Sequence, residues 1–580
     1  MNKSTSASKF PFHFPAKYHV SFTRDTPRSF SKNRPKYLRS LEINPWRIEL
    51  LRPMTRSLKH IKYASSIKSS FSKTEKNRTV DSLRPCIKTA KHIQILGVNH
   101  SFNAVTLANR NFSDLKSYSI QFLWKETLEC FAKLRKAETI RITFQKMIMG
   151  PVMDPAQQII EERHHLKRIV MKNLILEIPK ASPKEMMELA GSIPKSANLH
   201  FELESLPLTF RVNEYEEELC KKIKSIKLRS LTNSYLNSMV SSAGFLRNLT
   251  HLHLGKSSSV GVLELNQHSN YSLFSKLDEF KGLKSLKLNL RFGGETFPAL
   301  ALQFFKQIKL PVGLEVFSLD LDGIEMKEGS SLKLADFKWI VWQIEQMEEL
   351  KALRLNFGMS SVDKKSLNDF VSMLPKGLPK LEVLFTDIKV KEGEIYVHTD
   401  KVFEWVQSHP IVRNVQLDIP LINYFEMEKK KTFDYEMKHL ESLGLSISHE
   451  KVVVKDYFED FLVFLAKQEG LKCLNLRMQK SWNYVKTMEM MNKYLGAMAK
   501  LEDLRIEFKE HEGREFEEVF CLKPLIKKVR WFSLVVHSKM NVRLFDELCK
   551  IVSKELADEG RKKGKILEIS LNNAKLSSYL

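Results

Sequence analysis

The chain has 580 residues, 43% of them hydrophobic, which is enough for a large core and excludes global disorder. Its 93 Lys and Arg against 68 Asp and Glu give a net charge of +25, a surplus that favours polyanionic partners. No apolar run approaches the roughly 18 residues that span a bilayer and the six cysteines stand singly, so we expect no transmembrane segment, disulfide framework or cysteine-built zinc module.

Residues 1–85 are predicted to form a disordered basic arm. Residues 1–91 hold 21 Lys and Arg against 5 Asp and Glu, and the segment is rich in Ser, Thr and Pro. Such a composition cannot bury enough apolar area to offset chain entropy. Three roles stay open for the arm: a solvated tail without a ligand, a contact with RNA, DNA or anionic lipid, and an organelle transit peptide. We expect a cytoplasmic protein, with the nucleus as the alternative and organelle import less favoured.

A partial strand and a helix are predicted in residues 86–130, which we interpret as an N-terminal cap. Residues 131–580 then repeat one pattern: a leucine-like residue, two variable residues, a second leucine-like residue, and strict alternation. The clearest copies are LRNLTHLHL (246–254), LKSLKLNL (283–290), LEVFSLDL (314–321), LKALRLNF (350–357), LKCLNLRM (471–478) and LEDLRIEF (501–508). About fifteen copies follow one another, with the second leucine-like residue recurring every 25 to 36 residues from Ile140 to Leu567.

Between the predicted strands the hydrophobic period changes from two to 3.6, which indicates helices. Helical spacing is found in residues 297–309, 366–374, 457–467, 491–498 and 542–552. Another predicted helix, residues 339–347, carries Trp339 and Trp342, which we expect to pack in the core. Neighbouring strands need about 4.8 Å of width and helices about 10 Å, so stacked strand–helix units must bend. We therefore predict an α/β fold, a curved solenoid with a concave parallel sheet and convex helices.

This pattern resembles the leucine-rich repeat, in its long, helix-backed, ribonuclease-inhibitor-like form. The resemblance covers about residues 130–575 and rests on the LxxLxLxL strand followed by a helix. In that family an Asn usually follows the strand and links neighbouring turns, whereas Ser257 and Arg291 stand at that place here. The departure predicts an irregular horseshoe with uneven twist. The resemblance implies a binding scaffold rather than a catalyst.

We find no motif that indicates a catalytic residue, a cofactor or a metal. The glycine pair at 293–294 stands without the rest of a phosphate-binding loop. His164 and His165 would point about 100° apart on a helix, which suits a solvated face better than a joint metal site. Cys473 lacks a flanking pattern that would activate its thiol, so we expect it to be inert. The chain is predicted not to be an enzyme.

The variable positions inside the strands should face away from the core, on the concave side of the sheet. One predicted row contains Lys227, His253, Lys287, Ser318, Arg354, Phe385, Gln416, Gly444, Asn475, Arg505 and Ser533. The next contains Arg229, Gly255, Asn289, Asp320, Asn356, Asp387, Asp418, Ser446, Arg477, Glu507 and Val535. We predict partner binding by Arg229, Lys287, Asn289, Asp320, Arg354, Asn356, Asp387, Asp418, Asn475, Arg477, Arg505 and Glu507. The alternative is an ordinary solvated strand face.

The favoured hypothesis is a scaffold that binds an unidentified protein partner on the concave face, while the arm tethers or localises it. Arginine would supply forked hydrogen bonds and aspartate complementary charge. Mixed signs in the rows disfavour a nucleic-acid groove, which should be uniformly basic. One alternative is a protein that associates with nucleic acid or an anionic membrane through the arm. Another, implied by the resemblance, is an adaptor for a ubiquitin ligase or a GTPase regulator.

Overall fold

The structure is a computed structural model that describes part of the chain. The described residues are 19–22, 37–43, 63–70, 92–96, 116–122, 137–144, 154–161, 163–204, 217–229, 247–255, 263–265, 274–292, 303–322, 325–326, 338–362, 374–375, 377–390, 397–422, 435–447, 455–478, 484–511, 523–538, 566–571 and 574–579. These residues belong to two compact units. The first comprises residues 1–227, 546–567 and 574–580, and the second residues 228–545 and 568–573.

The first unit is built on strands that follow one another in the sequence. They are β1 (His19–Phe22), β2 (Tyr37–Ile43), β3 (Tyr63–Ser70), β4 (His92–Leu96), β5 (Ser117–Phe122), β6 (Thr139–Phe144), β7 (Asn173–Ile178), β8 (Asn198–Leu203) and β9 (Ile223–Leu228). From β1 to β8, each strand pairs in parallel with the next. The helices are α6 (Pro155–Glu161), α7 (Arg163–Lys167), α8 (Pro183–Gly191) and α9 (Glu217–Cys220). Strand β24 (Ala574–Tyr579) also belongs to this unit.

The second unit repeats the same arrangement. Its main strands are β10 (His251–Leu254), β12 (Ser285–Phe292), β13 (Val316–Asp322), β15 (Ala352–Val362), β16 (Val383–Val390), β18 (Asn414–Ile422), β19 (Ser442–Ile447), β20 (Cys473–Met478), β21 (Asp503–His511) and β22 (Trp531–Ser538). Each pairs in parallel with the next. Short strands β11 (Leu263–Leu265), β14 (Glu325–Met326) and β17 (Val397–His398) extend the pairing locally. Strand β23 (Ile566–Leu571) falls across the boundary between the units.

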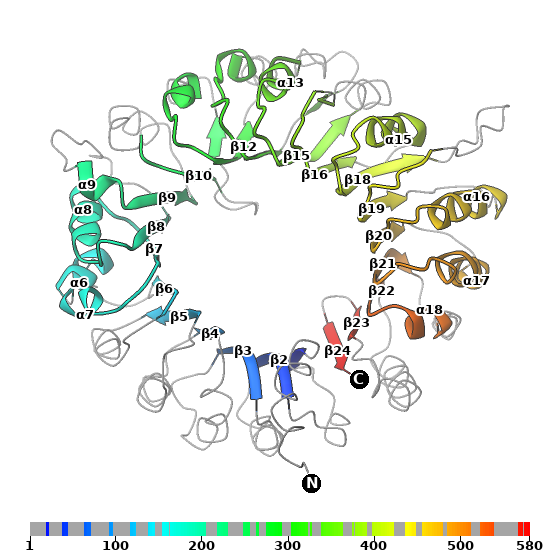
Figure 1. Cartoon of the computed structure of the whole chain (residues 1–580), viewed down its shortest axis with the longest axis horizontal. Helices are drawn as coiled ribbons and strands as arrows, with labels where there is room; N and C mark the ends of the chain where they lie inside the picture. The colour runs from blue at the N-terminus through cyan, green and yellow to red at the C-terminus, as the bar shows by residue number, and fades with distance from the viewer. Residues whose placement is uncertain are drawn as a thin grey trace, which may run out of the picture. The chain divides into compact units, whose positions relative to one another are not determined.

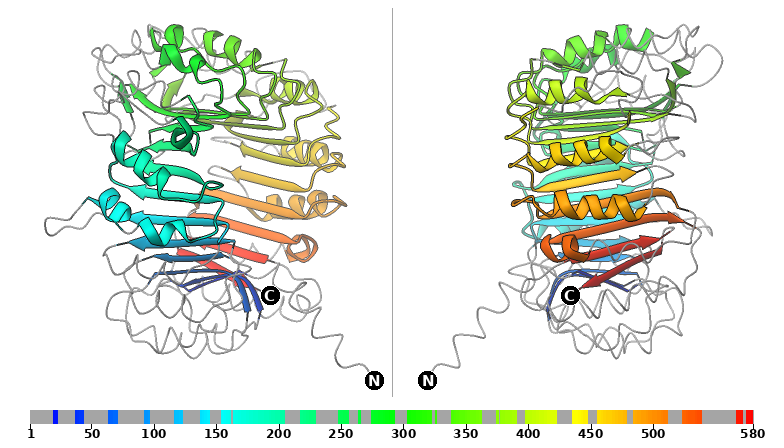
Figure 2. Two further views of the ribbon diagram at one scale, coloured as in Figure 1. Left: turned by 60° about the vertical axis from the view of Figure 1, so that its left-hand side comes forward. Right: turned by 90° about the vertical axis from the view of Figure 1, so that its right-hand side faces the viewer.

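Helices lie on one side of these strands (Figure 1). They are the 3₁₀ helix η5 (Phe274–Glu279), α13 (Lys338–Glu345), α15 (Thr399–Gln407), α16 (Lys455–Ala466), α17 (Tyr484–Leu495) and α18 (Lys523–Lys528). Within the second unit the strands follow an arc, with the helices on its outer side. Figure 2 shows the yellow and orange helices of this unit side by side next to their strands. The wider helices and narrower strands account for the curvature, as predicted.

The core lies between the strands and the helices. The leucine-like residues of the repeats are buried, including Leu286, Leu353 and Leu474, each at most 2% exposed. Each fully buried side chain of this kind contributes roughly 1.5–3 kcal/mol. One position of the predicted series is wrong. The repeat pattern places the second leucine-like residue of the copy NLHFEL (198–203) at Phe201, but Leu174 pairs with Leu199, so Leu199 is the equivalent residue in β8. Both side chains are buried, and the alternation alone does not distinguish them.

The parallel pairing reaches into the range predicted as a disordered arm. Within residues 1–85 the structure gives strand backbone to residues 19–22, 37–43 and 63–70, and the remainder lies outside the described residues. The sequence YLRSLEI in β2 follows the repeat pattern, which the overall composition of the arm concealed. The predicted cap, residues 86–130, contains β4 and β5, and β5 pairs onward with β6. Its strands therefore continue the series.

Three predicted helices are observed with shifted bounds, as α13, α16 and α17, and one prediction about side chains is wrong. Residues 457–467 and 491–498 fall largely within α16 and α17, while residues 303–307 of the predicted 297–309 helix are helical. The predicted helices at 366–374 and 542–552 lie almost wholly outside the described residues. On α13, Trp339 and Trp342 are 44% and 59% exposed rather than packed in the core. The core face of α13 is formed instead by Ile340, Val341 and Ile344.

Candidate interaction surface

The sheet side opposite the helices, here called the open face, carries the residues that alternate with the core side chains. In the second unit, the first predicted row is present in full. The register places His253, Lys287, Ser318, Arg354, Phe385, Gln416, Gly444, Asn475, Arg505 and Ser533 beside one another in that order. A period of two in each strand and an equal register between strands are sufficient to build this row.

The second predicted row is interrupted at β18. Asn289, Asp320, Asn356, Asp387 and Asp418 are neighbours in that order. The register then shifts between Leu417 and Pro420, so Pro420, and not Asp418, pairs with Ser446. Proline has no N–H for the ladder, which explains an irregularity at this point. Beyond it, Ser446, Arg477, Glu507 and Val535 again form a row.

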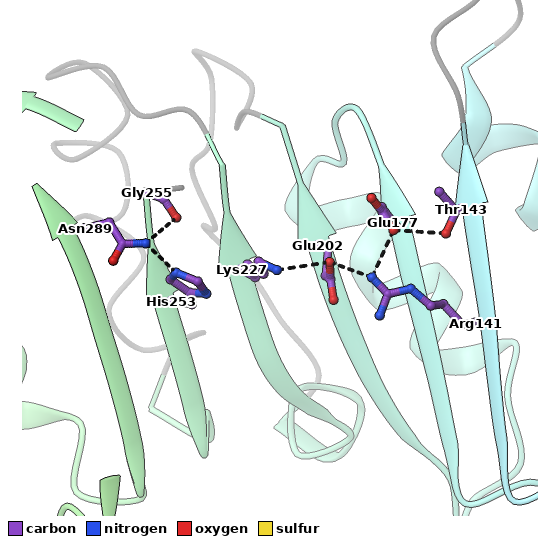
Figure 3. A network of polar contacts seen from close by, with 8 residues as sticks. All are labelled: Arg141, Thr143, Glu177, Glu202, Lys227, His253, Gly255 and Asn289. Carbon is purple, nitrogen blue, oxygen red and sulfur yellow. Dashed lines mark hydrogen bonds and ion pairs between the residues drawn. The ribbon is translucent and has the colours of Figure 1, made fainter. Parts of the chain in front are cut away.

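An ion-pair network crosses the open face of the first unit (Figure 3). Arg141 Nη2 lies 2.9 Å from Glu177 Oε2 and 2.8 Å from Glu202 Oε2. Lys227 Nζ is 3.4 Å from Glu202, and the Thr143 hydroxyl donates to Glu177 at 3.0 Å. Burial lowers the pKa of Arg141, but hydrogen bonds and charge from both glutamates outweigh burial, so its pKa is raised. The network therefore holds a charged arginine across β6, β7 and β8.

Two smaller polar networks lie on the open face of the second unit. The buried Asn289 amide donates to the Gly255 carbonyl at 3.4 Å and lies 2.9 Å from His253 Nε2 (Figure 3). Farther along, Arg477 Nε donates to Glu507 Oε2 at 3.1 Å, and Arg505 Nη2 is 3.5 Å from the same oxygen. The two arginines therefore share one buried carboxylate.

The predicted partner-binding residues differ in exposure. The exposed ones are Lys287, Arg354 and Arg505; the partly buried ones are Arg229, Asp320, Asn356, Asn475 and Arg477; the buried ones are Asn289 and Glu507. Only the backbones of Asp387 and Asp418 are described. Among these described side chains, the exposed charges are cations and the carboxylates are at least partly buried. The most exposed charges among these described side chains are therefore basic.

A charge ladder that the sequence analysis missed runs along the starts of the strands in the second unit. The residue preceding each main strand from β12 to β22 alternates in sign: Lys284, Glu315, Lys351, Glu382, Arg413, Glu441, Lys472, Glu502 and Arg530. When the repeats are aligned below one another, the sequence itself shows this alternation of charge.

Ion pairs and backbone hydrogen bonds both connect the ladder. Glu315 carboxylate oxygens lie 2.7 Å from Lys284 Nζ and 2.9 Å from Lys351 Nζ, and these two lysines lower its pKa to about 2. Glu441 lies similarly between Arg413, at 3.6 Å, and Lys472, at 3.0 Å. The carbonyl of each ladder residue from Lys284 to Lys472 also accepts hydrogen bonds from two successive N–H groups of the following repeat. The ladder residues thus connect each repeat to the next through both their side chains and their backbone.

On the helix side, two glutamine side chains, here called polar clasps, join neighbouring repeats by hydrogen bonds to the backbone. The Gln468 side chain is 3% exposed; its oxygen accepts from Met437 N at 2.8 Å and its amide donates to the Tyr435 and Phe464 carbonyls at 3.2 and 3.0 Å. Gln343 similarly accepts from Leu310 N at 2.7 Å and donates to the Ile308 carbonyl at 2.8 Å. These contacts satisfy buried backbone groups that would otherwise be unpaired.

Cys473 is a thiol held in a partly buried position on the open face. Its Sγ donates to Asp503 Oδ2 at 3.5 Å. Burial, followed by the charge of Asp503, raises the pKa of Cys473 to about 11. At neutral pH the group is therefore a thiol rather than a nucleophilic thiolate, in agreement with the predicted inert side chain.

No protein-family model matches the chain, and no curated protein matches it either. Within the part of the chain that the structure describes, no group of three or more His, Cys, Asp or Glu is placed to hold a metal ion. None of the described helices is long and apolar enough to cross a membrane.

Proposed function

We propose that the chain is a non-enzymatic scaffold of the leucine-rich-repeat type that binds a protein partner on its open face. The observation that carries the proposal is the first polar row, which stays in register from β10 to β22. A row of this length offers a partner many contacts at fixed spacing. Rigid elements hold such contacts in place before binding, which lowers the entropy cost of association.

The chemistry of the row favours an acidic or mixed-charge protein surface as partner. Lys287, Arg354 and Arg505 are exposed on the open face, and arginine offers forked hydrogen bonds to carboxylates. Neutral side chains such as Ser318, Gln416 and Ser533 separate these cations. A nucleic-acid groove would have a denser series of cations along the row.

The test compares two triple variants of the full chain that carry the same change in charge. In the open-face variant Lys287, Arg354 and Arg505 are changed to Glu; in the helix-side control the exposed lysines Lys306, Lys309 and Lys338 are changed to Glu. Affinity purification followed by mass spectrometry should give the same set of captured proteins for wild type and control. The open-face variant should lose that set while keeping its circular dichroism spectrum. Unchanged capture by the open-face variant would refute the proposal.

The basic N-terminal segment supports a second candidate, attachment to nucleic acid or an anionic membrane through residues 1–85. Its observation is the excess of cations, 21 against 5 acidic residues in residues 1–91. Deleting the segment would also remove β1, β2 and β3. The Lys and Arg of residues 1–85 outside these three strands should therefore be replaced by Gln. This variant would lose binding to heparin or anionic vesicles if the segment carries the affinity, and would keep it otherwise.

A further inference from the structure

The buried His409 and the partly buried His439 both lie at the end of α15, in the second unit. His409 stands six residues before Val415, the second leucine-like residue of its repeat. The same position holds a buried apolar side chain in five other repeats, Phe280, Met347, Leu378, Met437 and Met498, and the buried Gln468 in one more. At 6% exposure, His409 places a titratable ring where five other repeats place an apolar side chain. A histidine at this core position requires an explanation.

The contacts of His409 fix its protonation on Nδ1. Nδ1 lies 2.7 Å from the Trp405 carbonyl, which can only accept, so Nδ1 carries the hydrogen. The Ser408 hydroxyl is 3.0 Å from the same nitrogen and donates to the same carbonyl at 2.7 Å. The ring stacks on Trp405 with centroids 4.1 Å apart. In the neutral ring Nε2 is then an acceptor, and this buried atom has no hydrogen-bond partner among the described residues.

His439, from the following repeat, is partly buried and also contacts the end of α15. Its ring is hydrogen-bonded to the backbone of Val406, in the last turn of α15, and its Nε2 is also buried without a described partner. Burial lowers the pKa of His439, the Val406 hydrogen bond opposes this shift, and the charge of His409 adds to it. Two imidazoles from consecutive repeats therefore bind the C-terminal turn of one helix.

The charged groups around the pair do not neutralise an added proton. On the His439 segment, Glu436 pairs with Lys438 at 2.9 Å, and Glu441 pairs with Lys472 and Arg413. On α15, Glu404 is exposed, as are Lys467 and Glu469 at the end of α16. The packed neighbour at that end is the neutral Gln468, whose amide is fully used in the clasp described above. Among the charged groups of the described residues, His409 is the one whose charge shifts the pKa of His439.

We propose that His409 and His439 form an acid-sensitive latch that holds the end of α15 when both rings are neutral and releases it when they are protonated. Protonation adds an N–H at each buried Nε2, where no described acceptor is present, and the charge of His409 opposes a positive charge on His439. Both changes disfavour the closed arrangement. Opening would be local, between the repeat that contains α15 and the repeat that begins with the segment 435–440.

The sign of the pH dependence follows from the direction of the shift. A histidine with a lowered pKa in the folded state binds its proton more readily in the opened chain. Above pH 6.5, the ordinary value, His439 is neutral in both states and the latch is closed. As the pH falls below 6.5, the opened state gains protons first, so the closed state loses stability progressively until the folded-state pKa is passed.

The experiment measures amide hydrogen exchange of the full chain at pH 7.5 and pH 5.5, corrected for the intrinsic effect of pH on exchange. Peptides covering residues 399–412 should lose protection at pH 5.5 by roughly tenfold, the effect of one unpaired buried donor. The variant His409→Met, which restores the apolar residue of the other repeats, should keep most of its protection. His164→Gln, at an exposed position on α7, serves as control and should behave as wild type. Equal protection of wild type at both pH values would overturn the proposal.

A second measurement keeps the proposal testable if His409→Met fails to fold. The wild-type chain labelled with ¹³C at histidine Cε1 is titrated by NMR, and the His439 resonance is identified by its loss in His439→Gln. A His439 midpoint below 6.5 supports the latch. A midpoint at or above 6.5 refutes it, because the pair would then favour protons when closed.

Discussion

Gln468 offers the sharpest test of how neighbouring repeats are held together. The change Gln468→Met removes the clasp while keeping a side chain of similar volume, and methionine is the residue that other repeats place here, as Met347 and Met498 show. Three hydrogen bonds are lost, and the Met437 N–H is left buried without its acceptor. Each bond contributes a net 0.5–1.5 kcal/mol, so we expect unfolding of this region to become easier by roughly 2–4 kcal/mol.

The assay is local, because a repeat array opens in segments rather than as one body. Hydrogen exchange of the Met437 amide should quicken by roughly 30- to 1000-fold, the equivalent of 2–4 kcal/mol. Gln407→Met is the matched control, since Gln407 is exposed at the end of α15, and should leave this amide unchanged. If Gln468→Met exchanged at the wild-type rate, the clasp would not stabilise the contact between repeats.

Three further results are expected from single positions. Gly255→Ala should lower the unfolding free energy, measured in urea, by more than about 1 kcal/mol, because Gly255 has φ +88° and a Cβ would lie 2.2 Å from Asn289 O. Gly313→Ala is the control: a Cβ at Gly313 meets open space, so the unfolding free energy should not fall. Lys284 and Lys351 hold the pKa of Glu315 near 2, so the ionised Glu315 stabilises the folded chain above pH 4.5, and this stabilisation is lost as the pH falls from 4.5 towards 2. Glu315→Gln should therefore reduce the loss of folding stability between pH 4.5 and pH 2. An unchanged loss would contradict a stabilising role of the charge ladder. Cys473, with a pKa of about 11, should be alkylated by iodoacetamide at pH 8 more slowly in the folded chain than after denaturation, as peptide mass spectrometry would show; equal rates would refute the assignment.

The strands and the first row of the open face could be predicted because both depend on a period of two within each repeat. Leu353 and Leu474 are buried, and Arg354 and Asn475 face the other way, as alternation requires. The same local rule fails at Asp418, where Pro420 shifts the register of a whole strand pair. It fails at Phe201 too, because two buried positions in one strand are equivalent until a neighbour fixes the register.

Features that depend on several repeats together could not be predicted from one segment at a time. Trp339 and Trp342 have helical spacing, but Ile340, Val341 and Ile344 occupy the core face of α13 instead. The N-terminal strands were hidden by the high charge of the segment around them, although YLRSLEI follows the repeat pattern. The latch of His409 and His439 joins residues of consecutive repeats, and neither residue signals the other in the sequence.

The charge ladder has a consequence for how such a chain can be lengthened or shortened. Copying a single unit would set two like charges side by side at the seam, whereas copying units in pairs keeps opposite charges adjacent. From Lys284 to Arg530 the alternation is unbroken, so the piece that can be inserted or excised without a repulsive contact is a doublet. In electrostatic terms, the module of this array is therefore two strand–helix units, and the sign of the charge before each strand distinguishes the two.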